Sequence, residues 1–251
     1  MTRYRAAAIH IALSFVVASA VFLLNYLLWY PDALFDQAGG RELFALIAGV
    51  DVAIGPLITL IVFVPGKKGL AFDIATIAVL QLTALTYGTW VLFESRPAYI
   101  VFVKDRFELV RANEIADEDL GKAQSPAYAS LPWTGPRIVG ARIPKDPDEQ
   151  FRIAMSAMSG RDIQAFPKHY VGYDEVRTEV VSRAAPFARL RELNPNSVAE
   201  LDRLVAKLGL PETQLRFLPM RAGQYVDLTV LVDASRGDVL NISALRPWDY
   251  K

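Results

Sequence analysis

The first 95 residues contain three apolar runs, and each of them is long enough to cross a lipid bilayer. The runs extend from Ala6 to about Tyr30, from about Leu43 to Val64 and from Leu70 to about Phe93. A helix of about 20 apolar residues, rising about 1.5 Å per residue, spans the hydrocarbon core of a membrane. The sequence therefore predicts three transmembrane helices.

The first run also has features of a secretory signal peptide. It starts with Arg3 and Arg5, and the small residues Ala-Ser-Ala at 18–20 match a cleavage site. The apolar core of a signal peptide is about 7–15 residues long, whereas this run continues to Trp29 and Tyr30. We therefore expect a retained helix, with the two aromatic side chains at the membrane interface.

Charged residues divide the chain into two unequal parts. Residues 1–95 hold 11 charged side chains and residues 96–251 hold 43. We expect a three-helix transmembrane domain over 1–95 and a water-soluble domain over 96–251, which is long enough to bury a core of its own. The net charge of the chain is zero, which argues against nucleic acid as a partner.

Basic residues near the ends of the runs predict the orientation in the membrane. Arg3 and Arg5 precede the first run, and Lys67 and Lys68 lie in the turn between the second and third. The loop 31–42 is mostly acidic. The positive-inside rule then places the N-terminus in the cytoplasm, and three spans place residues 96–251 in the periplasm, with the helices in a bacterial inner membrane.

The residue types that most enzymes and metal sites need are scarce. The chain has no cysteine, and its two histidines, His10 and His169, lie in different parts. No nucleophile motif or phosphate-binding glycine loop is present. Asp105 and Asp174 have no spacing that distinguishes them from solvated surface acids. We expect no enzymatic activity, no metal and no cofactor.

Asp51 is the one carboxylate in the apolar stretch FALIAGVDVAIGPLITLIVF at 44–63. It lies about eight residues from the outer end of its span, or roughly 12 Å deep. A charge at that depth is costly, and ionisable residues inside membranes are often functional. Two interpretations stay open: Asp51 fastens the three helices together, or it meets a partner helix or a proton.

Antiparallel packing of the spans suggests partners for Asp51. Tyr87 in the third run lies at a similar depth, with Thr83 and Thr86 close by, and Asn25 in the first run could also reach it. Gln81 marks the middle of the third run. Asp73 lies near the Lys67-Lys68 turn, where a charge costs less.

The second run is also built for close helix contact. Ala45, Gly49 and Ala53 form a stripe of small residues, which lets helices approach closely. Gly55 and Pro56 follow, and a proline frees backbone carbonyls and bends a helix. These features predict a helix that touches another polar surface.

Residues 96–251 predict an α+β domain with a mostly antiparallel sheet. After Arg96-Pro97, the β-rich stretches 98–103 and 106–110 flank a turn and indicate a hairpin at the membrane surface. The loop residue Trp133 is expected in the core. Further elements are expected as follows: a helix starting at Asp146 with Phe151, Met155 and Met158 on one face, a helix over 173–184, a helix from Pro195 to Leu208 capped by Asn194, and strands at 213–220, 225–233 and 238–245.

The last two strands flank an Arg-Gly-Asp triplet at 236–238. The triplet matches an integrin-binding motif, but glycine and aspartate are also common turn residues. We interpret it as a hairpin turn. Val226, Leu228, Val230 and Val232 alternate along the preceding strand, so they should share one face.

Residues 25–110 resemble the type IV pilin accessory protein family, the TfpX/TfpZ group. The features that carry the resemblance are, in order, Tyr30-Pro31, Gly49-Val50-Asp51, Gly55-Pro56-Leu57, Asp73, Gln81, Tyr87-Gly88, Arg96-Pro97 and Asp105-Arg106-Phe107. The rest of the outer domain matches only loosely.

The resemblance implies an inner-membrane, chaperone-like protein that keeps a type IV pilin stable or ready for assembly. Such a pilin waits in the membrane as one helix with a globular outer head, so the expected partners are a pilin subunit and the bilayer. The alternatives are a membrane-anchored periplasmic sensor or scaffold and, third, a pilin-modifying enzyme. Candidate contact residues are Asp51, Gly55, Pro56, Asp73, Gln81, Tyr87, Arg96, Pro97, Asp105, Arg106 and Phe107.

Overall fold

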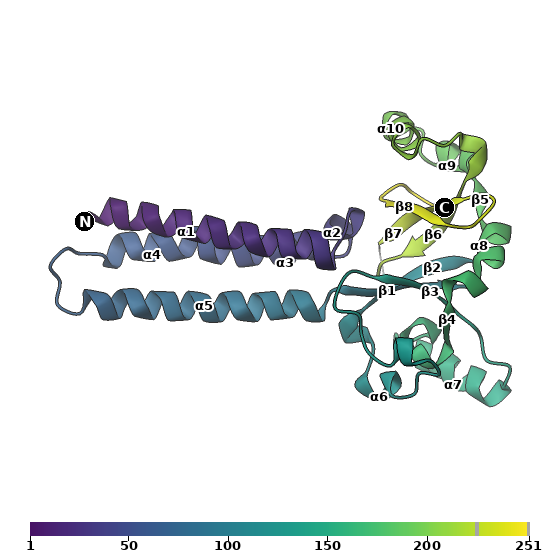
Figure 1. Ribbon diagram of the computed structural model, residues 1–251, viewed down its shortest axis with the longest axis horizontal. Coiled ribbons are helices and arrows are strands. Elements are labelled where there is room, and N and C mark those ends of the chain that lie inside the picture. Colours follow the sequence, from purple (N-terminus) through teal and green to yellow (C-terminus); the bar gives the residue numbers. More distant parts are fainter. Residues whose placement is uncertain (224–225, 250–251) are drawn as a thin grey trace.

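The computed structural model describes residues 1–223 and 226–249 and consists of a helical arm attached to a body built on a β-sheet. The N-terminus lies at the free end of the arm, and the last described residues belong to the body (Figure 1). The strand predicted over 225–233 starts at a residue outside the described ranges. The arm and the body together confirm the predicted fold class of apolar helices followed by an α+β domain.

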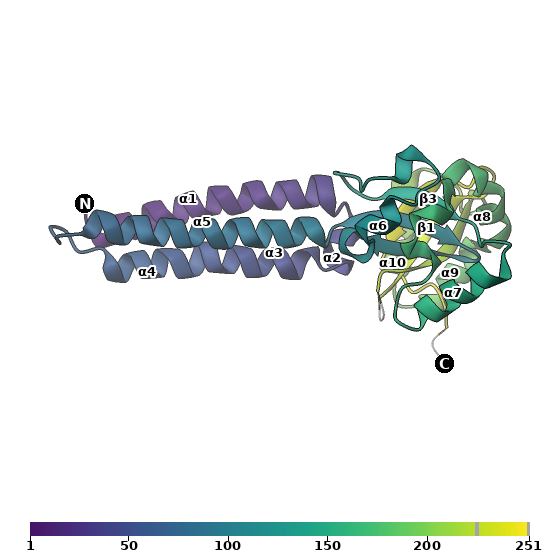
Figure 2. The ribbon, with the colours of Figure 1, turned by 90° about the horizontal axis from the view of Figure 1, so that it is seen from below.

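Three continuous helical stretches in the arm are long and apolar enough to cross a membrane: Arg3–Trp29, Gly40–Val62 and Leu70–Glu94. They match the three predicted spans, and Figures 1 and 2 show them side by side along the long axis. Their elements are α1 (Arg3–Leu24), a π-helical turn (Asn25–Trp29), α2 (Ala33–Gln37), α3 (Gly40–Gly49), a second π-helical turn (Val50–Ile54), α4 (Gly55–Val62) and α5 (Leu70–Glu94).

The α3–α4 helix packs against both of the other spans. His10 Nδ1 of α1 lies 2.7 Å from the Thr59 hydroxyl of α4. Gln81 of α5 approaches Gly55, and Ile47 of α3 approaches Gly88 of α5. The α3–α4 helix therefore lies against α1 on one side and α5 on the other.

The body contains an eight-stranded sheet in the order β4-β3-β1-β2-β6-β7-β8, with β5 paired to β6. The pairs β1–β3 and β2–β6 are parallel and the others antiparallel, so the sheet is mixed but mostly antiparallel. The strands are β1 (Pro97–Val103), β2 (Arg106–Arg111), β3 (Arg137–Ala141), β4 (Tyr170–Gly172), β5 (Ala185–Pro186), β6 (Leu215–Arg221), β7 (Asp227–Asp233) and β8 (Val239–Ser243).

Short helices and turns connect the strands. The α-helices are α6 (Asp117–Leu120), α7 (Pro147–Ala157), α8 (Arg177–Arg183), α9 (Phe187–Leu193) and α10 (Val198–Leu208), and the 3-10 turns are Ala112–Glu114, Pro126–Tyr128, Ile163–Ala165, Pro167–His169, Tyr173–Glu175 and Glu212–Gln214.

The largest hydrophobic core joins the body to the arm. Phe102, Phe107 and Val230 from the sheet pack there with Tyr30 and Leu34, which come from the connection between the first two spans. The predicted alternation in the last strands is confirmed, because Leu228, Val230 and Val232 lie in this core and Val226 packs against it. The body and the end of the arm therefore share one core, and no separate linker lies between them.

Two local predictions were wrong. Trp133 is 77% exposed, because it packs on the ring of Phe93 at the surface. Asn194 does not cap α10, since its side chain instead bonds the main chain of Leu190 and Arg246. The helix predicted to start at Asp146 is present as α7, and Phe151, Met155 and Met158, which were predicted to share one face, are exposed.

Candidate partner-contact site

Asp51 faces the interior of the arm. Only 5% of its surface is exposed, and its carboxylate oxygen Oδ1 is buried without a hydrogen-bond partner among the described residues. Its main-chain oxygen accepts a bond of 3.3 Å from Gln81 Nε2 of α5. An unpaired carboxylate oxygen at this depth is costly. Asp51 is thus a buried polar side chain within an otherwise apolar bundle.

The local backbone around Asp51 departs from a regular α-helix. The second π-helical turn places the Gly55 N–H against the oxygen of Val50, five residues earlier. Pro56 follows at the start of α4, where its missing N–H is tolerated. The expected bend thus takes the form of a π-helical turn, a feature that is frequent at functional sites.

Gly55 lets α5 come close to this turn. A Cβ atom at residue 55 would lie 1.9 Å from Gln81 Nε2, so any larger residue must displace that side chain. Asp51, Gly55 and Gln81 therefore form one contact between the second and third spans.

The remaining suggested partners of Asp51 point elsewhere. Thr83 and Thr86 donate their hydroxyls to main-chain oxygens on their own helix, at 2.8 and 2.7 Å. Tyr87 is 65% exposed on the outer face of α5. Asn25 bonds the Val21 oxygen of its own helix at 2.8 Å.

The outward face of α5 carries a polar and aromatic stripe. Thr83, Thr86, Tyr87 and Trp90 line a shallow groove there, together with Val79 and Leu82. The rings of Tyr87 and Trp90 are 5.9 Å apart. Threonine hydroxyls and small residues are typical of contacts between transmembrane helices, so this face, named here the α5 stripe, is suited to a further helix.

Arg96 fastens the body to the end of α5. Its side chain is almost fully buried and donates to the oxygens of Pro132, at 3.1 and 2.7 Å, and of Phe93, at 2.5 Å. Burial lowers its pKa from the ordinary value. We name these contacts of Arg96 with Phe93 and Pro132 the Arg96 clamp. The neighbouring Pro97 begins β1, so the sheet starts directly after the clamp.

Aromatic rings surround the same junction. The guanidinium carbon of Arg96 lies 3.6 Å from the centre of the Phe93 ring, and that ring packs against Trp29 and Trp133. The Tyr30 hydroxyl donates to the Leu92 oxygen at 3.2 Å. Aromatic side chains favour the membrane interface, and here they surround the junction at which the apolar helix α5 ends and the body begins.

The hairpin candidates lie at the opposite end of β1. Phe107 is fully buried in the core, whereas Asp105 and Arg106 line a pocket of about 410 Å³ beside α7. Arg106 Nε donates to Glu108 at 2.6 Å, and burial raises the pKa of that carboxyl. Arg106 also lies 3.7 Å from Asp105, so the pocket contains two ion pairs that share the partly exposed Arg106.

The eleven candidate residues do not gather at one place. Asp73 pairs with Lys67 at 2.6 Å near the turn between the second and third spans. Asp51, Gly55, Pro56 and Gln81 lie inside the arm, while the other candidates lie on the α5 stripe, at the clamp and at the hairpin. The structure thus offers a series of surfaces along its long axis.

Comparison with known proteins finds relatives over most of the chain. A family model described as fimbrial assembly protein FimB matches residues 1–32. The fimbrial assembly protein of serogroup E1 from Dichelobacter nodosus is 30% identical over 228 residues, which are 90% of this chain and 88% of that protein. This chain belongs to the fimbrial assembly protein family. The predicted resemblance to pilin accessory proteins is confirmed at that level.

Other relatives in the fimbrial assembly family give the same picture. The serogroup I protein of Dichelobacter nodosus is 29% identical over 228 residues, again 90% of this chain and 88% of the relative. The protein of serogroups C1 and C2 is 35% identical over 117 residues, which are 46% of this chain and 89% of that relative. No solved structure matches the chain.

The described residues of this family member contain no group of three or more histidine, aspartate or glutamate side chains placed to hold a metal ion. Charged groups instead form ion pairs that link elements of the body.

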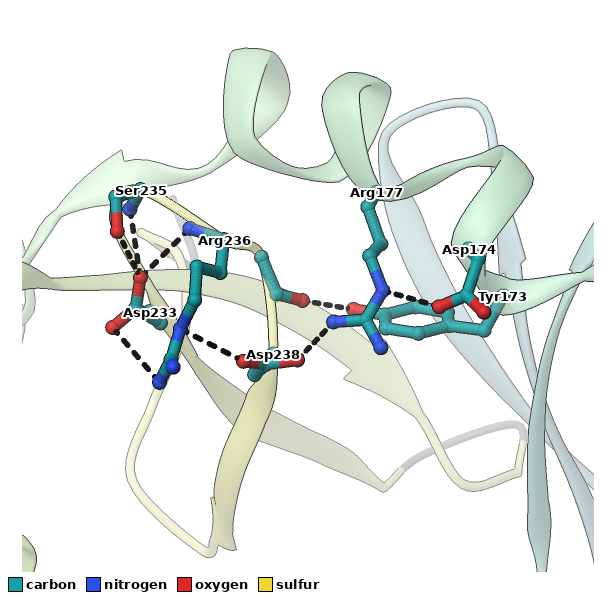
Figure 3. Close-up of polar contacts among 8 residues, drawn as sticks. Tyr173, Asp174, Arg177, Asp233, Ser235, Arg236 and Asp238 are labelled. Atoms are coloured by element: carbon teal, nitrogen blue, oxygen red, sulfur yellow. Dashed lines mark hydrogen bonds and ion pairs between the residues drawn. The ribbon is translucent and has the colours of Figure 1, made fainter.

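One such network was missed by sequence analysis. Figure 3 shows Arg177 between Asp174 and Asp238, with Arg236 on the other side of Asp238. The Tyr173 hydroxyl donates to the Gly237 oxygen at 2.5 Å, and burial raises the pKa of Tyr173 to about 12. The Arg-Gly-Asp triplet is thus a turn held against α8, as expected. Asp174 and Arg177 are three residues apart, but nothing in the sequence signals their link to residue 238.

Proposed function

We propose that this protein is an inner-membrane accessory protein that assists a type IV pilin before or during pilus assembly, without catalysing a reaction. Its named relatives are fimbrial assembly proteins, which supports a role in assembling pili. The basic residues around the first span and in the turn after the second favour a cytoplasmic N-terminus and a periplasmic body. Residues 1–95 then act in the membrane and residues 96–251 outside it.

The observation that carries the proposal is the exposure of α5. Only 6% of its membrane-spanning window is buried inside the structure, against 17% and 28% for the other two spans. The α5 stripe adds hydroxyls and aromatic rings to this open face. A pilin waiting in the membrane as a single helix would find there the groups that hold transmembrane helices together.

The interior of the arm would keep that face in place. Asp51, Gly55 and Pro56 set the contact with Gln81, and this contact fixes how α5 is turned relative to the α3–α4 helix. Their role in the proposal is therefore to shape the pilin contact, while Tyr87 and its neighbours make it.

The body would act on the head of the pilin. The Arg96 clamp leaves no flexible linker between α5 and β1, so the body stays at a set height above the bilayer. Asp105 and Arg106 follow the end of β1 that is opposite the Arg96 clamp, and they are candidate contacts for the pilin head. Holding a pilin at both its helix and its head would protect it until assembly.

Deletion of the gene in its own bacterium tests the proposal. Surface-sheared pili and total cellular pilin are measured in parallel. Lost pili with pilin present would indicate a role in assembly, and lost pilin would indicate stabilisation. Unchanged pili and unchanged pilin would refute the proposal.

Complementation with Asp51→Asn then tests the interior contact. The expected result is reduced pilus output at a normal level of this protein. The substitution replaces the buried carboxyl group by a neutral amide next to the contact with Gln81. A matched Asp117→Asn variant, at an exposed aspartate of α6 that has no role in the proposal, should restore pili fully. Normal output from Asp51→Asn would remove Asp51 from the mechanism.

A further inference from the structure

A groove at the junction of arm and body combines charges of both signs. It has a volume of about 540 Å³ and lies between the end of the first span, α2, α10 and the edge strand β8. In Figures 1 and 2, α10 lies on the side of the body that faces the arm. The side chains that matter most are those of Tyr26, Asp32, Asp36, Arg203, Lys207 and Asn241.

The groove lies at the level where lipid headgroups surround the protein. Tyr26 lines it from the outer end of the first span and is itself exposed. The aromatic rings of Trp29 and Phe93 mark the same interface a few residues further along the chain. Whatever fills this groove must therefore be found at the surface of the bilayer.

The arm-side wall of the groove is acidic, whereas the α10 wall carries the basic residues Arg203 and Lys207 together with the acidic Glu200. Arg203 and Lys207 lie one turn apart on α10, and Asp32 lies on the arm side just before α2. Asp36 is already paired with Arg41 at 2.5 Å. Within residues 1–223 and 226–249, Asp32, Arg203 and Lys207 form no ion pair, although ion pairs are common elsewhere on the body.

Unpaired charges of both signs around one groove favour a ligand that carries both. A phosphodiester is bound by arginine and lysine, and anionic groups at a membrane surface are attracted to such residues. An ammonium group a few bonds away would meet the carboxylate of Asp32. A phospholipid with a primary amine in its headgroup has both groups and is a component of bilayers.

We propose that this groove binds the headgroup of a zwitterionic, amine-bearing phospholipid, with its phosphate on Arg203 and Lys207 and its ammonium on Asp32. The acyl chains would then lie along the exposed apolar residues Leu23 and Leu27 of the first span. The bound lipid would fill the space under α10 and steady the body over the membrane. This inference does not depend on the partner of the α5 stripe.

The test uses the full-length protein, freed of lipid in detergent micelles and titrated with single phospholipids in native mass spectrometry. Phosphatidylethanolamine carries both groups, phosphatidylglycerol lacks the ammonium, and phosphatidylcholine has an ammonium that cannot donate hydrogen bonds. We expect phosphatidylethanolamine to bind about fivefold more tightly than the other two, the effect of about one charged contact at a membrane surface.

Variants separate the two walls of the groove. Asp32→Asn should reduce the affinity for phosphatidylethanolamine to that for phosphatidylglycerol, because only the ammonium contact is lost. Arg203→Gln with Lys207→Gln should weaken both lipids by about tenfold or more. Lys145→Gln, an exposed lysine in the loop before α7, is the matched control and should change neither. All the substituted residues are exposed, and circular dichroism checks that each variant is folded.

A photoactivatable analogue of phosphatidylethanolamine gives a second measurement in reconstituted membranes. Crosslinks should map to peptides containing residues 32–37 and 200–207. Equal binding of all three lipids by the protein and all its variants would overturn the proposal. A purified pilin that crosslinks to Lys207 and excludes the lipid analogue would overturn it as well, because the groove would then hold a protein segment.

Discussion

The helical arm and the body bury their residues to very different degrees. In the three spans, between 6% and 28% of the membrane-crossing window is buried, whereas all seven residues of β1 are. Water drives apolar side chains of the body into a core, but lipid tails give no such drive between helices. The body is thus stabilised by a core that takes in Tyr30 and Leu34 at the end of the arm, whereas the three spans leave most of their apolar surface exposed.

The largest effect is expected from a substitution that opens a cavity in the core of the body. Phe102 is 1% exposed, and Phe102→Ala should cost about 3–5 kcal/mol of unfolding free energy through a cavity. Leu80→Ala, on a residue of α5 that is 66% exposed, is the matched control and should change it by less than about 0.5 kcal/mol. Denaturant unfolding in micelles measures both. Equal losses would show that the arm depends on packing as much as the body does.

The next effect separates the two regions. Arg96→Ala should leave the Pro132 and Phe93 oxygens without their buried donor and cost about 3 kcal/mol. Protease cleavage in the loop 130–136 should increase at the same time, because that loop loses its anchor. Arg142→Ala removes only an exposed ion pair with Glu175 and serves as control. If both variants behave alike, the clamp does not join arm and body.

A smaller effect tests packing inside the arm. Gly55→Ala should destabilise the protein by about 1–2 kcal/mol relative to Gly49→Ala. The new methyl group meets Gln81 in the first variant and has no neighbour within 4 Å in the second. Both replacements remove a helical glycine, so the difference reports the contact. The double variant Gly55→Ala/Gln81→Ala should recover part of the loss, and no recovery would place the strain elsewhere.

The smallest effect concerns the turn in Figure 3. Tyr173→Phe should cost about 1 kcal/mol at neutral pH through one lost hydrogen bond. Because burial raises the pKa of Tyr173 to about 12, its contribution is complete below pH of about 10, the unfolded value, and is lost as pH rises towards 12. Stability curves of the two proteins should therefore converge in that alkaline window. Parallel curves would contradict the assigned pKa.

Much of the fold could be predicted because it depends on local patterns. Apolar length alone gives the three spans, and alternation gives the paired strands β7 and β8. The turn at Gly237 follows from residue type, and its φ of 71° is one that glycine adopts readily.

The rest depends on how helices are rotated and on contacts between distant residues. Depth in the membrane suggested Tyr87 as a partner of Asp51, but rotation of α5 turns it outward and brings Gln81 inward. The partner of Arg96 is a main-chain oxygen 36 residues away, which no side-chain pattern reveals. The same contact explains why Trp133 is exposed, because Arg96 binds the oxygen of the preceding Pro132 and holds this loop at the surface of the junction.

Cysteine crosslinking in living cells can show whether a pilin helix lies on the α5 stripe, because the chain has no cysteine of its own. Tyr87→Cys on the α5 stripe is compared with Leu46→Cys, which lies at a similar depth because Ile47 packs against Gly88, and is 69% exposed on another span. A co-expressed pilin carries single cysteines along its membrane helix. We expect a pilin adduct with Tyr87→Cys and little with Leu46→Cys. Equal adducts at both positions, or none while pili form normally, would contradict this expectation.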